Sequence, residues 1–277
     1  MSHLSAPGRV VCAFAVTRTP PPADVLAATP GHAEGGPLRA LPAGDLYLVV
    51  QDVPAASFDE AALTERLNDP ADLEHCARAH HRGVEAAART GPVVPLPLAT
   101  LYRTDHGAAA AVTSRAAVLG ALLDRLRGRT EWAVKVHAAE ADGPADAAPV
   151  GVGGVDGRSY LSRASARRRV RQDSRGRAAA GAEAVDAELR RYAVAATRHR
   201  PQSEQLTGRR APQLLNAAYL VDDARRAGFT AALSRLRADG GAAGVELSAS
   251  GPWIPYSFAA WDSGRDDRES APQAVRS

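Results

Sequence analysis

Four residues that can bind a metal ion or carry a proton lie close together in the sequence. His75, Cys76, His80 and His81 fall in a stretch whose apolar spacing predicts a single helix. Cys76 and His80 are four residues apart, so a helix would place them on one face, where a thiolate and an imidazole can share a metal. No second ligand pair occurs elsewhere, and the HExxH pattern is absent. Because His80 also falls on the apolar stripe, a packed histidine with one hydrogen bond is the preferred interpretation, and no metal site is predicted.

No other catalytic set assembles from the sequence. The glycine-rich stretch GVGGVDG at 151–157 matches neither the GxGxxG dinucleotide motif nor a P-loop, so it is interpreted as a linker. No GxSxG nucleophile elbow occurs, and nothing ties the serines and histidines into a triad. We therefore predict no catalytic residue and no cofactor. An enzyme would need a cleft in which groups such as His80, Glu131 and Lys135 converge.

Positive charge is concentrated in one segment. Residues 158–210 hold 14 arginines against five acids, which gives +9, whereas the whole chain carries +3. The densest part, ARRRVRQ at 166–172, supplies the candidate partner-binding residues Arg167, Arg168, Arg169 and Arg171. A solvated helix face is the simplest interpretation, followed by a surface for an acidic protein. Nucleic acid is least favoured because no aromatic residues interleave with the arginines; it defines the alternative function, a nucleic-acid-binding regulator.

The segment GPWIPYSF at 251–258 concentrates aromatic residues in a chain that is only 5% aromatic. Gly251 permits a turn, and the two prolines fix φ and stiffen the backbone of the segment. The aromatic side chains then have a low-entropy route into a groove, which we expect at a border between domains. The predicted structural latch consists of Gly251, Pro252, Trp253, Pro255, Tyr256 and Phe258. The alternative is an exposed aromatic platform for a partner.

The composition is typical of a globular protein with a substantial core. Hydrophobic residues make up 45% of the 277 positions, and no apolar run is long enough for a transmembrane helix. The first apolar run, near Val10, is interpreted as a strand instead of a signal peptide, so a cytoplasmic location is expected. Cys12 and Cys76 lack a CxxC partner and are expected to be small buried residues.

The first half of the chain has an α+β pattern. Ser57 and Glu60 have the spacing of a capping box at a helix start. The other expected elements are strands at 10–17 and 46–52, a long loop at 18–44, and helices at 70–89 and 114–127. The proline-punctuated stretch at 93–102 is expected to be an edge strand or an extended segment along a domain border.

From Glu131 onward the expected order is strand, helix, strand, strand, helix, strand, which is the ferredoxin-like split βαβ order with extra helices after the first strand. The segments 131–136, 214–221 and 245–249 should share one antiparallel sheet. Alternation should turn Trp132, Val134 and Val136 to its core, or the opposite face if the register is shifted by one residue. We therefore predict two α+β domains, the second of them ferredoxin-like. Their bounds are 1–107 and 108–262, followed by a polar tail at 263–277.

Five ordered motifs resemble the GvpL/GvpF family of gas vesicle proteins. They are AHHRGVEAAARTGPVVPLPLATLY, EWAVKV, GRSYL, LLNAAYLV and GPWIPYSF, in the same order as in the family, and they cover most of residues 8–260. The sequence departs from the family pattern at three places. Ile254 replaces a proline, His81 replaces a glutamate, and Pro97 to Thr100 read PLAT where an RFGT-like segment is usual.

The resemblance implies a non-catalytic role in the formation of gas vesicles, which are protein-walled, gas-filled shells that give buoyancy. It implies binding to the small hydrophobic shell protein and to other vesicle accessory proteins, with no membrane partner. It also implies a fold of two α+β domains, the second ferredoxin-like with extra helices, and a cytoplasmic, vesicle-associated location.

Overall fold

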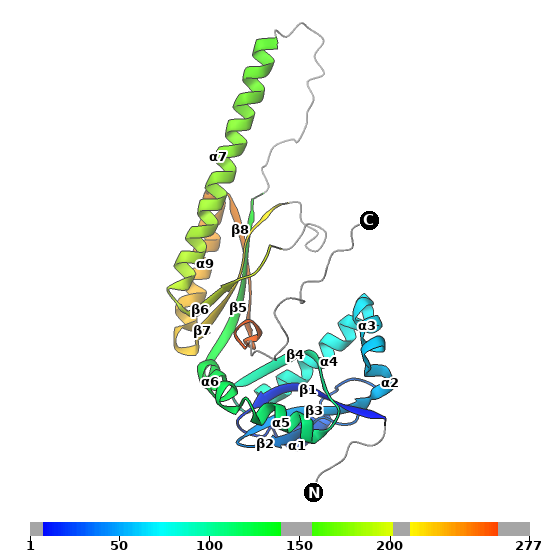
Figure 1. Cartoon of the computed structure of the whole chain (residues 1–277). Helices are drawn as coiled ribbons and strands as arrows, with labels where there is room; N and C mark the ends of the chain where they lie inside the picture. The colour runs from blue at the N-terminus through cyan, green and yellow to red at the C-terminus, as the bar shows by residue number, and fades with distance from the viewer. Residues whose placement is uncertain (1–7, 140–156, 202–210, 260–277) are drawn as a thin grey trace. The chain divides into compact units, whose positions relative to one another are not determined.

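The computed structural model describes residues 8–139, 157–201 and 211–259, apart from the side chains of 157–164, 167, 171 and 241–243. The chain forms two compact units, one made of Met1–Arg127 with Phe258–Ser277 and the other of Gly128–Ser257. Each unit holds a four-stranded antiparallel sheet with helices, so the fold is mixed α+β, as predicted (Figure 1). The sequence places a border after residue 107, whereas the contacts group residues 108–127 with the first unit.

The sheet of the first unit has the strand order β2-β3-β1-β4. Its strands are β1 (Arg9–Thr17), β2 (Arg39–Ala43), β3 (Leu46–Pro54) and β4 (Val93–Tyr102). Every residue of β1 from Val11 to Thr17 is buried, so both faces of the sheet are covered. The proline-punctuated β4 lies at an edge, as the sequence predicts, because proline cannot donate to a ladder on both sides.

Helix α4 (Pro70–Ala88) packs on the first sheet, and Gly83 lies where the two approach closely. Asp69 caps its start, because its carboxylate accepts hydrogen bonds from the backbone N–H groups of Ala71 and Asp72, both at 2.9 Å. A Cβ on Gly83 would lie 2.5 Å from the Cδ1 atom of Phe14, so only glycine allows this close approach. The predicted helix at 70–89 is therefore confirmed.

Residues 18–44 correct the expectation of a long loop. They contain helix α1 (Ala23–Ala28) and the edge strand β2. The buried Gln51 side chain fixes the turn between them: its Oε1 accepts from the N–H of His32 at 2.9 Å, and its Nε2 donates to the Gly36 carbonyl at 2.7 Å. A single buried amide thus organises a stretch that has little apolar patterning of its own.

The remaining helices of the first unit are short, and one predicted cap is wrong. They are α2 (Ala55–Phe58), α3 (Glu60–Asn68), α5 (Asp105–Thr113) and α6 (Ala116–Leu126). Asp59, and not Ser57, caps α3, because Asp59 accepts a hydrogen bond from the N–H of Ala62 at 2.8 Å. No single described helix is long and apolar enough to cross a membrane. Helices α5 and α6 together reach that length and composition, with a bend of 72° between them.

The sheet of the second unit has the order β6-β7-β5-β8, and all neighbouring strands are antiparallel. The strands are β5 (Arg129–Ala138), β6 (Ala193–Arg198), β7 (Gln213–Asp222) and β8 (Val245–Trp253). The prediction that 131–136, 214–221 and 245–249 share one antiparallel sheet is confirmed. The register pairs Trp132 with Tyr219 and Val136 with Leu247.

Two helices cover one face of this sheet: α7 (Gly157–Arg190) and α9 (Arg226–Ala243), which follows the short 3-10 turn η1 (Asp223–Arg225) (Figure 1). Val134, Val136 and Tyr219 are buried against Val185, Leu189 and Phe229 of the helices. Trp132 packs on the margin of this core. The core-facing alternation expected for Trp132, Val134 and Val136 is therefore confirmed.

Candidate partner-binding surface

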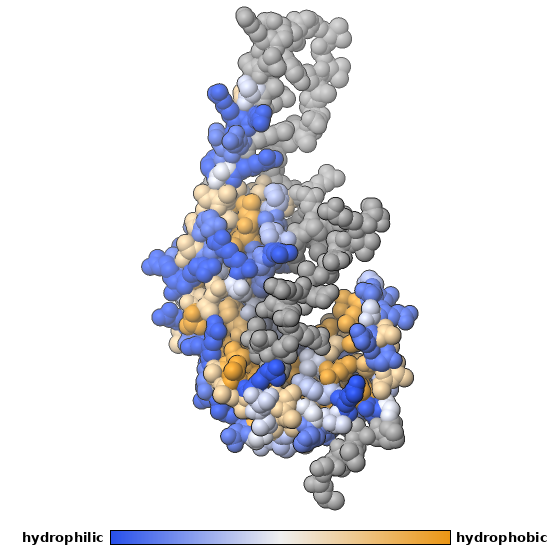
Figure 2. Space-filling model, viewed as in Figure 1, coloured by the Kyte–Doolittle hydropathy of each residue, from blue (hydrophilic) through white to orange (hydrophobic). Residues whose placement is uncertain are grey.

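Helix α7 has two halves with different surroundings. Its C-terminal half carries a buried stripe that packs on the sheet, consisting of Ala178, Ala182, Val185, Asp186 and Leu189. In its N-terminal half, every side chain that the structure describes between residues 165 and 177 is exposed, and Val170 is 64% exposed. The helix extends beyond the end of the sheet (Figure 1), and its projecting part is mostly hydrophilic (Figure 2). We call residues 165–177 the projecting half.

The described arginines of the projecting half have no carboxylate partner among the residues that the structure describes. Arg168, Arg169, Arg175 and Arg177 are exposed and form no ion pair among the described residues. The side chains of Arg167 and Arg171, also predicted for partner binding, lie outside the described part of the chain. The packed half differs, because there the acids of α7 bind arginines. Glu188, for example, accepts from Arg235 at 2.6 Å and from Arg191 at 3.1 Å.

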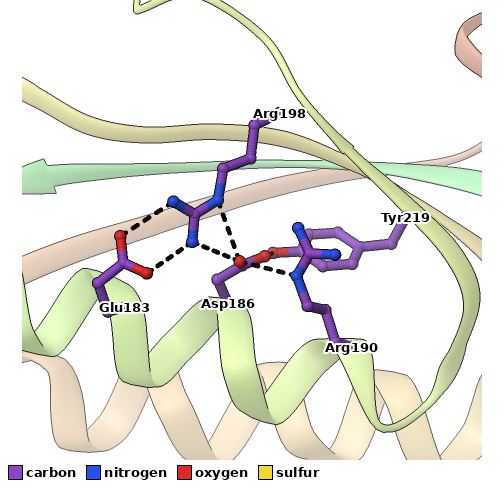
Figure 3. Close-up of polar contacts among 5 residues, drawn as sticks. All are labelled: Glu183, Asp186, Arg190, Arg198 and Tyr219. Carbon is purple, nitrogen blue, oxygen red and sulfur yellow. Dashed lines mark hydrogen bonds and ion pairs between the residues drawn. The ribbon is translucent and has the colours of Figure 1, made fainter.

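A buried carboxylate anchors the packed half (Figure 3). Asp186 of α7 accepts hydrogen bonds from the hydroxyl of Tyr219 at 2.5 Å and from Nη2 of Arg198 at 2.6 Å. Arg190, one turn along the helix, donates from Nε at 2.9 Å. Arg198 also binds both carboxylate oxygens of Glu183, at 3.0 and 2.6 Å, in a bidentate pair. The network ties α7 to β6 and β7.

The electrostatics of this anchor follow from its geometry. Burial acts to raise the pKa of Asp186, but the hydrogen bonds from Tyr219, Arg190 and Arg198 outweigh it and hold the pKa below its usual range. Burial and the neighbouring Asp186 raise the pKa of Tyr219. Asp186 is therefore ionised and Tyr219 neutral at physiological pH, which keeps the donor and acceptor roles fixed.

The GPWIPYSF segment combines buried and exposed side chains. Pro255 is buried and Phe258 is only 7% exposed, whereas Trp253 and Tyr256 are 48% and 39% exposed. Trp253 therefore lacks the full burial expected of a latch residue. Strand β8 continues through Gly251 and Pro252, whose peptide bond is cis, so the segment begins as strand and not as a turn.

Polar contacts fasten this segment to β5. The buried Glu131 carboxylate accepts from the N–H of Ser257 at 2.8 Å and from its hydroxyl at 2.7 Å. Gly251 has φ +142°, and a Cβ there would lie 2.9 Å from the Glu131 carbonyl oxygen, so this site requires glycine. Residues up to Ser257 belong to the second unit and Phe258 to the first. The latch role itself stays a prediction.

Three of the side chains that were considered for chemistry, Cys76, His80 and Glu131, are buried and packed in the fold. The Nε2 atom of the buried His80 lies 3.0 Å from the Leu96 carbonyl oxygen, which confirms the packed histidine. Cys12 and Cys76 are buried free thiols, and no cluster of three metal-ligating side chains occurs within the described ranges. The Glu131 carboxylate accepts a hydrogen bond from the Ser257 hydroxyl. The glycine-rich stretch up to residue 156 lies outside the described residues.

Sequence reasoning missed the anchor and the Ser257 contact. Asp186 and Tyr219 are 33 positions apart, and Glu131 and Ser257 are 126 apart, so no local pattern connects either pair. One signal was present: Asp186 falls on the apolar stripe of a helix, where a charge requires a buried partner. The motif that contains Tyr219, LLNAAYLV, predicts a strand and supports the family resemblance, but it does not indicate that Tyr219 binds a carboxylate.

Comparisons with known proteins place the chain in a family. Residues 11–260 match the family model described as "Gas vesicle synthesis protein GvpL/GvpF". Gas vesicle protein L from Streptomyces sp. (strain CB03234) is 39% identical over 255 residues, covering 91% of this chain and 93% of the relative.

Two solved structures share the fold. GvpF from Anabaena sp. PCC7120 has a TM-score of 0.62 at 15% identity, covering 91% of this chain and 97% of that one. GvpF from Microcystis aeruginosa has a TM-score of 0.61 at 15% identity, covering 91% and 99%. With the family model matching nearly the whole described chain and a close relative in sequence, the chain belongs to the GvpL/GvpF family of gas vesicle proteins.

Proposed function

We propose that this protein is a non-catalytic accessory factor of gas vesicle assembly that binds the hydrophobic shell protein and other vesicle proteins. Family membership over residues 11–260 is the observation that carries the proposal. The surface also supports it, because the exposed groups gathered on α7 are suited to binding instead of bond chemistry. The proposed location is the cytoplasm, in association with vesicles.

The need for such a factor follows from the chemistry of a gas-filled shell. A shell protein that lines a gas space carries a large apolar face, and that face would aggregate in water before assembly. An accessory factor can protect it with an apolar groove or an open sheet edge. Both sheets here are open, with β2, β4, β6 and β8 at their edges.

We further propose a two-domain organisation in which the second unit is a ferredoxin-like variant. The element order β5, α7, β6, β7, α9, β8 is the split βαβ pattern. The antiparallel order β8-β5-β7-β6 places the first and third strands at the centre, which suits that assignment. The long α7 would be the family's elaboration of the first crossover.

Gene deletion tests the proposed function. A vesicle-forming host that lacks this gene should form no vesicles or deformed ones, as seen by electron microscopy, and the wild-type gene should restore them. Normal vesicles in the deletion strain would refute the proposal.

A further inference from the structure

The face of α7 that packs on the sheet continues into the projecting half with a change of chemistry. Positions seven apart lie on one side of a helix, displaced by only about 20°. Counting by sevens from the buried Leu189 leads to the buried Ala182 and then to Arg175 and Arg168. One row of the stripe that packs the helix on its own sheet therefore continues as arginine where the sheet has ended. We call Arg168 and Arg175 the arginine face.

The opposite side of the projecting half provides a contrast. Arg177 is two residues beyond Arg175, which on a helix is a rotation of about 200°. Both side chains are exposed, and neither forms an ion pair within the described part of the chain. They differ in orientation alone: Arg175 follows the packing side of α7 and Arg177 points away from it.

The arginine–carboxylate contacts in the packed half of α7 indicate which partner chemistry would suit the arginine face. There, guanidinium groups join elements of this protein by binding carboxylates across them, as Arg198 binds Glu183 and Arg235 binds Glu188. Guanidinium matches carboxylate through paired hydrogen bonds, and it is the cation best suited to protein interfaces. A partner element that continues the packing surface beyond the sheet would complement Arg168 and Arg175 with glutamate or aspartate.

Nucleic acid fits the same surface less well. The described side chains between residues 165 and 177 include no aromatic group that could stack on a base. A duplex would also respond to the total charge of the helix and not to one of its sides.

We propose that the arginine face is a docking site for an acidic helix of another protein, which lies along the projecting half of α7. The inference rests on the proposed function, because the acidic partner would be one of the vesicle proteins. It deepens that function by assigning one surface and one partner chemistry.

Charge reversal at matched positions tests the side of the helix that binds. The full-length protein would be titrated with a synthetic helical peptide that carries glutamate along one face, and with a DNA duplex, at low and at physiological salt. Arg175→Glu should weaken peptide binding about tenfold or more, while Arg177→Glu should change it less than about threefold. Circular dichroism would confirm that both variants fold like the wild type.

Complementation of the deletion host with a double variant of the arginine face, and with Arg177→Glu, separates this inference from the proposed function. Arg168→Glu with Arg175→Glu should impair vesicle formation, whereas Arg177→Glu should restore it. Equal weakening of the peptide by both single variants would overturn the arginine face, as would tighter binding of the duplex than of the peptide at the same salt. If vesicles form normally without the gene, the proposed function fails instead, whatever the peptide shows.

Discussion

At the scale of the residue, Ala99 marks a departure from the family pattern. Its φ is +63°, a left-handed conformation that costs a residue with a Cβ about 1–2 kcal/mol. It lies in the irregular part of β4, where Thr100 donates a hydrogen bond to the Pro97 carbonyl at 2.7 Å. The family's RFGT-like segment has glycine at this position. We predict that Ala99→Gly raises the free energy of unfolding by about 0.5–1 kcal/mol, after the added chain entropy of glycine is subtracted.

Urea unfolding of the wild type and Ala99→Gly would check this. Gly107→Ala is a suitable reference for the opposite exchange, because Gly107 lies in the first turn of α5 without a positive φ. If Ala99→Gly unfolds at a lower urea concentration than the wild type, the left-handed backbone at Ala99 is not strained.

Trp253 and Phe258 lie in one segment but differ in burial. Trp253 is 48% exposed and Phe258 only 7%. Phe258→Ala should lower stability by about 3–5 kcal/mol, as for other buried aromatic truncations, whereas Trp253→Ala should cost about 1–2 kcal/mol. Thermal melts of the isolated protein would measure both. Equal losses would show that Trp253 is buried in solution and would favour the latch for the whole segment.

The buried His32 makes the first unit sensitive to acid. Burial, with the positive charges of His80, Arg66 and Arg82, lowers the pKa of His32 from 6.5 to about 4, against a smaller opposing effect of Glu34. Well above pH 6.5 the His32 imidazole is neutral in both the folded and the unfolded protein, so its titration does not change the free energy of unfolding. As pH falls from 6.5 towards 4, only the unfolded chain binds the proton, so stability is lost over that window.

Between about pH 7 and pH 5 this loss should reach about 2 kcal/mol. Urea unfolding at both pH values would measure it, and His32→Phe should flatten the dependence. His80 has its pKa lowered by burial too, so the variant should retain a smaller slope. A wild-type stability that is constant over this range would contradict the account.

At the scale of the element, two helix glycines have opposite roles. A Cβ on Gly176 of α7 would meet nothing within 4 Å, whereas a Cβ on Gly83 of α4 would strike Phe14. Gly176→Ala should stabilise the helix by about 0.5–1 kcal/mol, because alanine loses less backbone entropy. Gly83→Ala should destabilise by about 1–3 kcal/mol through overpacking.

Amide hydrogen exchange would locate the first effect and urea unfolding the second. Exchange of the amides at 165–177 should slow in Gly176→Ala, since they lie in the half of α7 without tertiary packing. Unchanged exchange there would show that the projecting half is not limited by its glycine.

The strands and long helices could be predicted from the sequence because their patterns are local. EWAVKV has large apolar residues at every second position, which indicates a strand, and this strand is part of β5. The stretch 158–191 has no proline, and most of it forms α7. Helix α1 and strand β2 were missed because they lie among prolines and glycines, and the buried Gln51 that orders them comes from another strand.

The surface was predictable only in part. The arginines at 167–171 were found by composition, but composition does not show which side of the helix each one occupies. Arg175 was missed because its significance depends on where the sheet ends and the buried stripe stops. The anchor around Asp186 joins residues of α7, β6 and β7, which only the folded chain brings together.

At the scale of the whole molecule, two α+β units carry different features. The first holds buried histidines and a sheet covered on both faces, and the second holds the anchored helix with its projecting arginines. His32 lies in the first unit and Arg175 in the second. Variants at His32 and at Arg175 should therefore act independently when combined, because the two residues belong to different compact units.

We propose that this protein binds the shell protein and protects its apolar face, and co-expression tests this role most directly. The shell protein would be produced alone, with the wild-type chain, and with the double Arg168→Glu, Arg175→Glu variant as a control for the arginine face. After centrifugation and size-exclusion chromatography, the wild-type chain should keep shell protein in the supernatant and elute with it in one peak. Shell protein that sediments equally with and without the wild-type chain, or that elutes apart from it, would contradict the account.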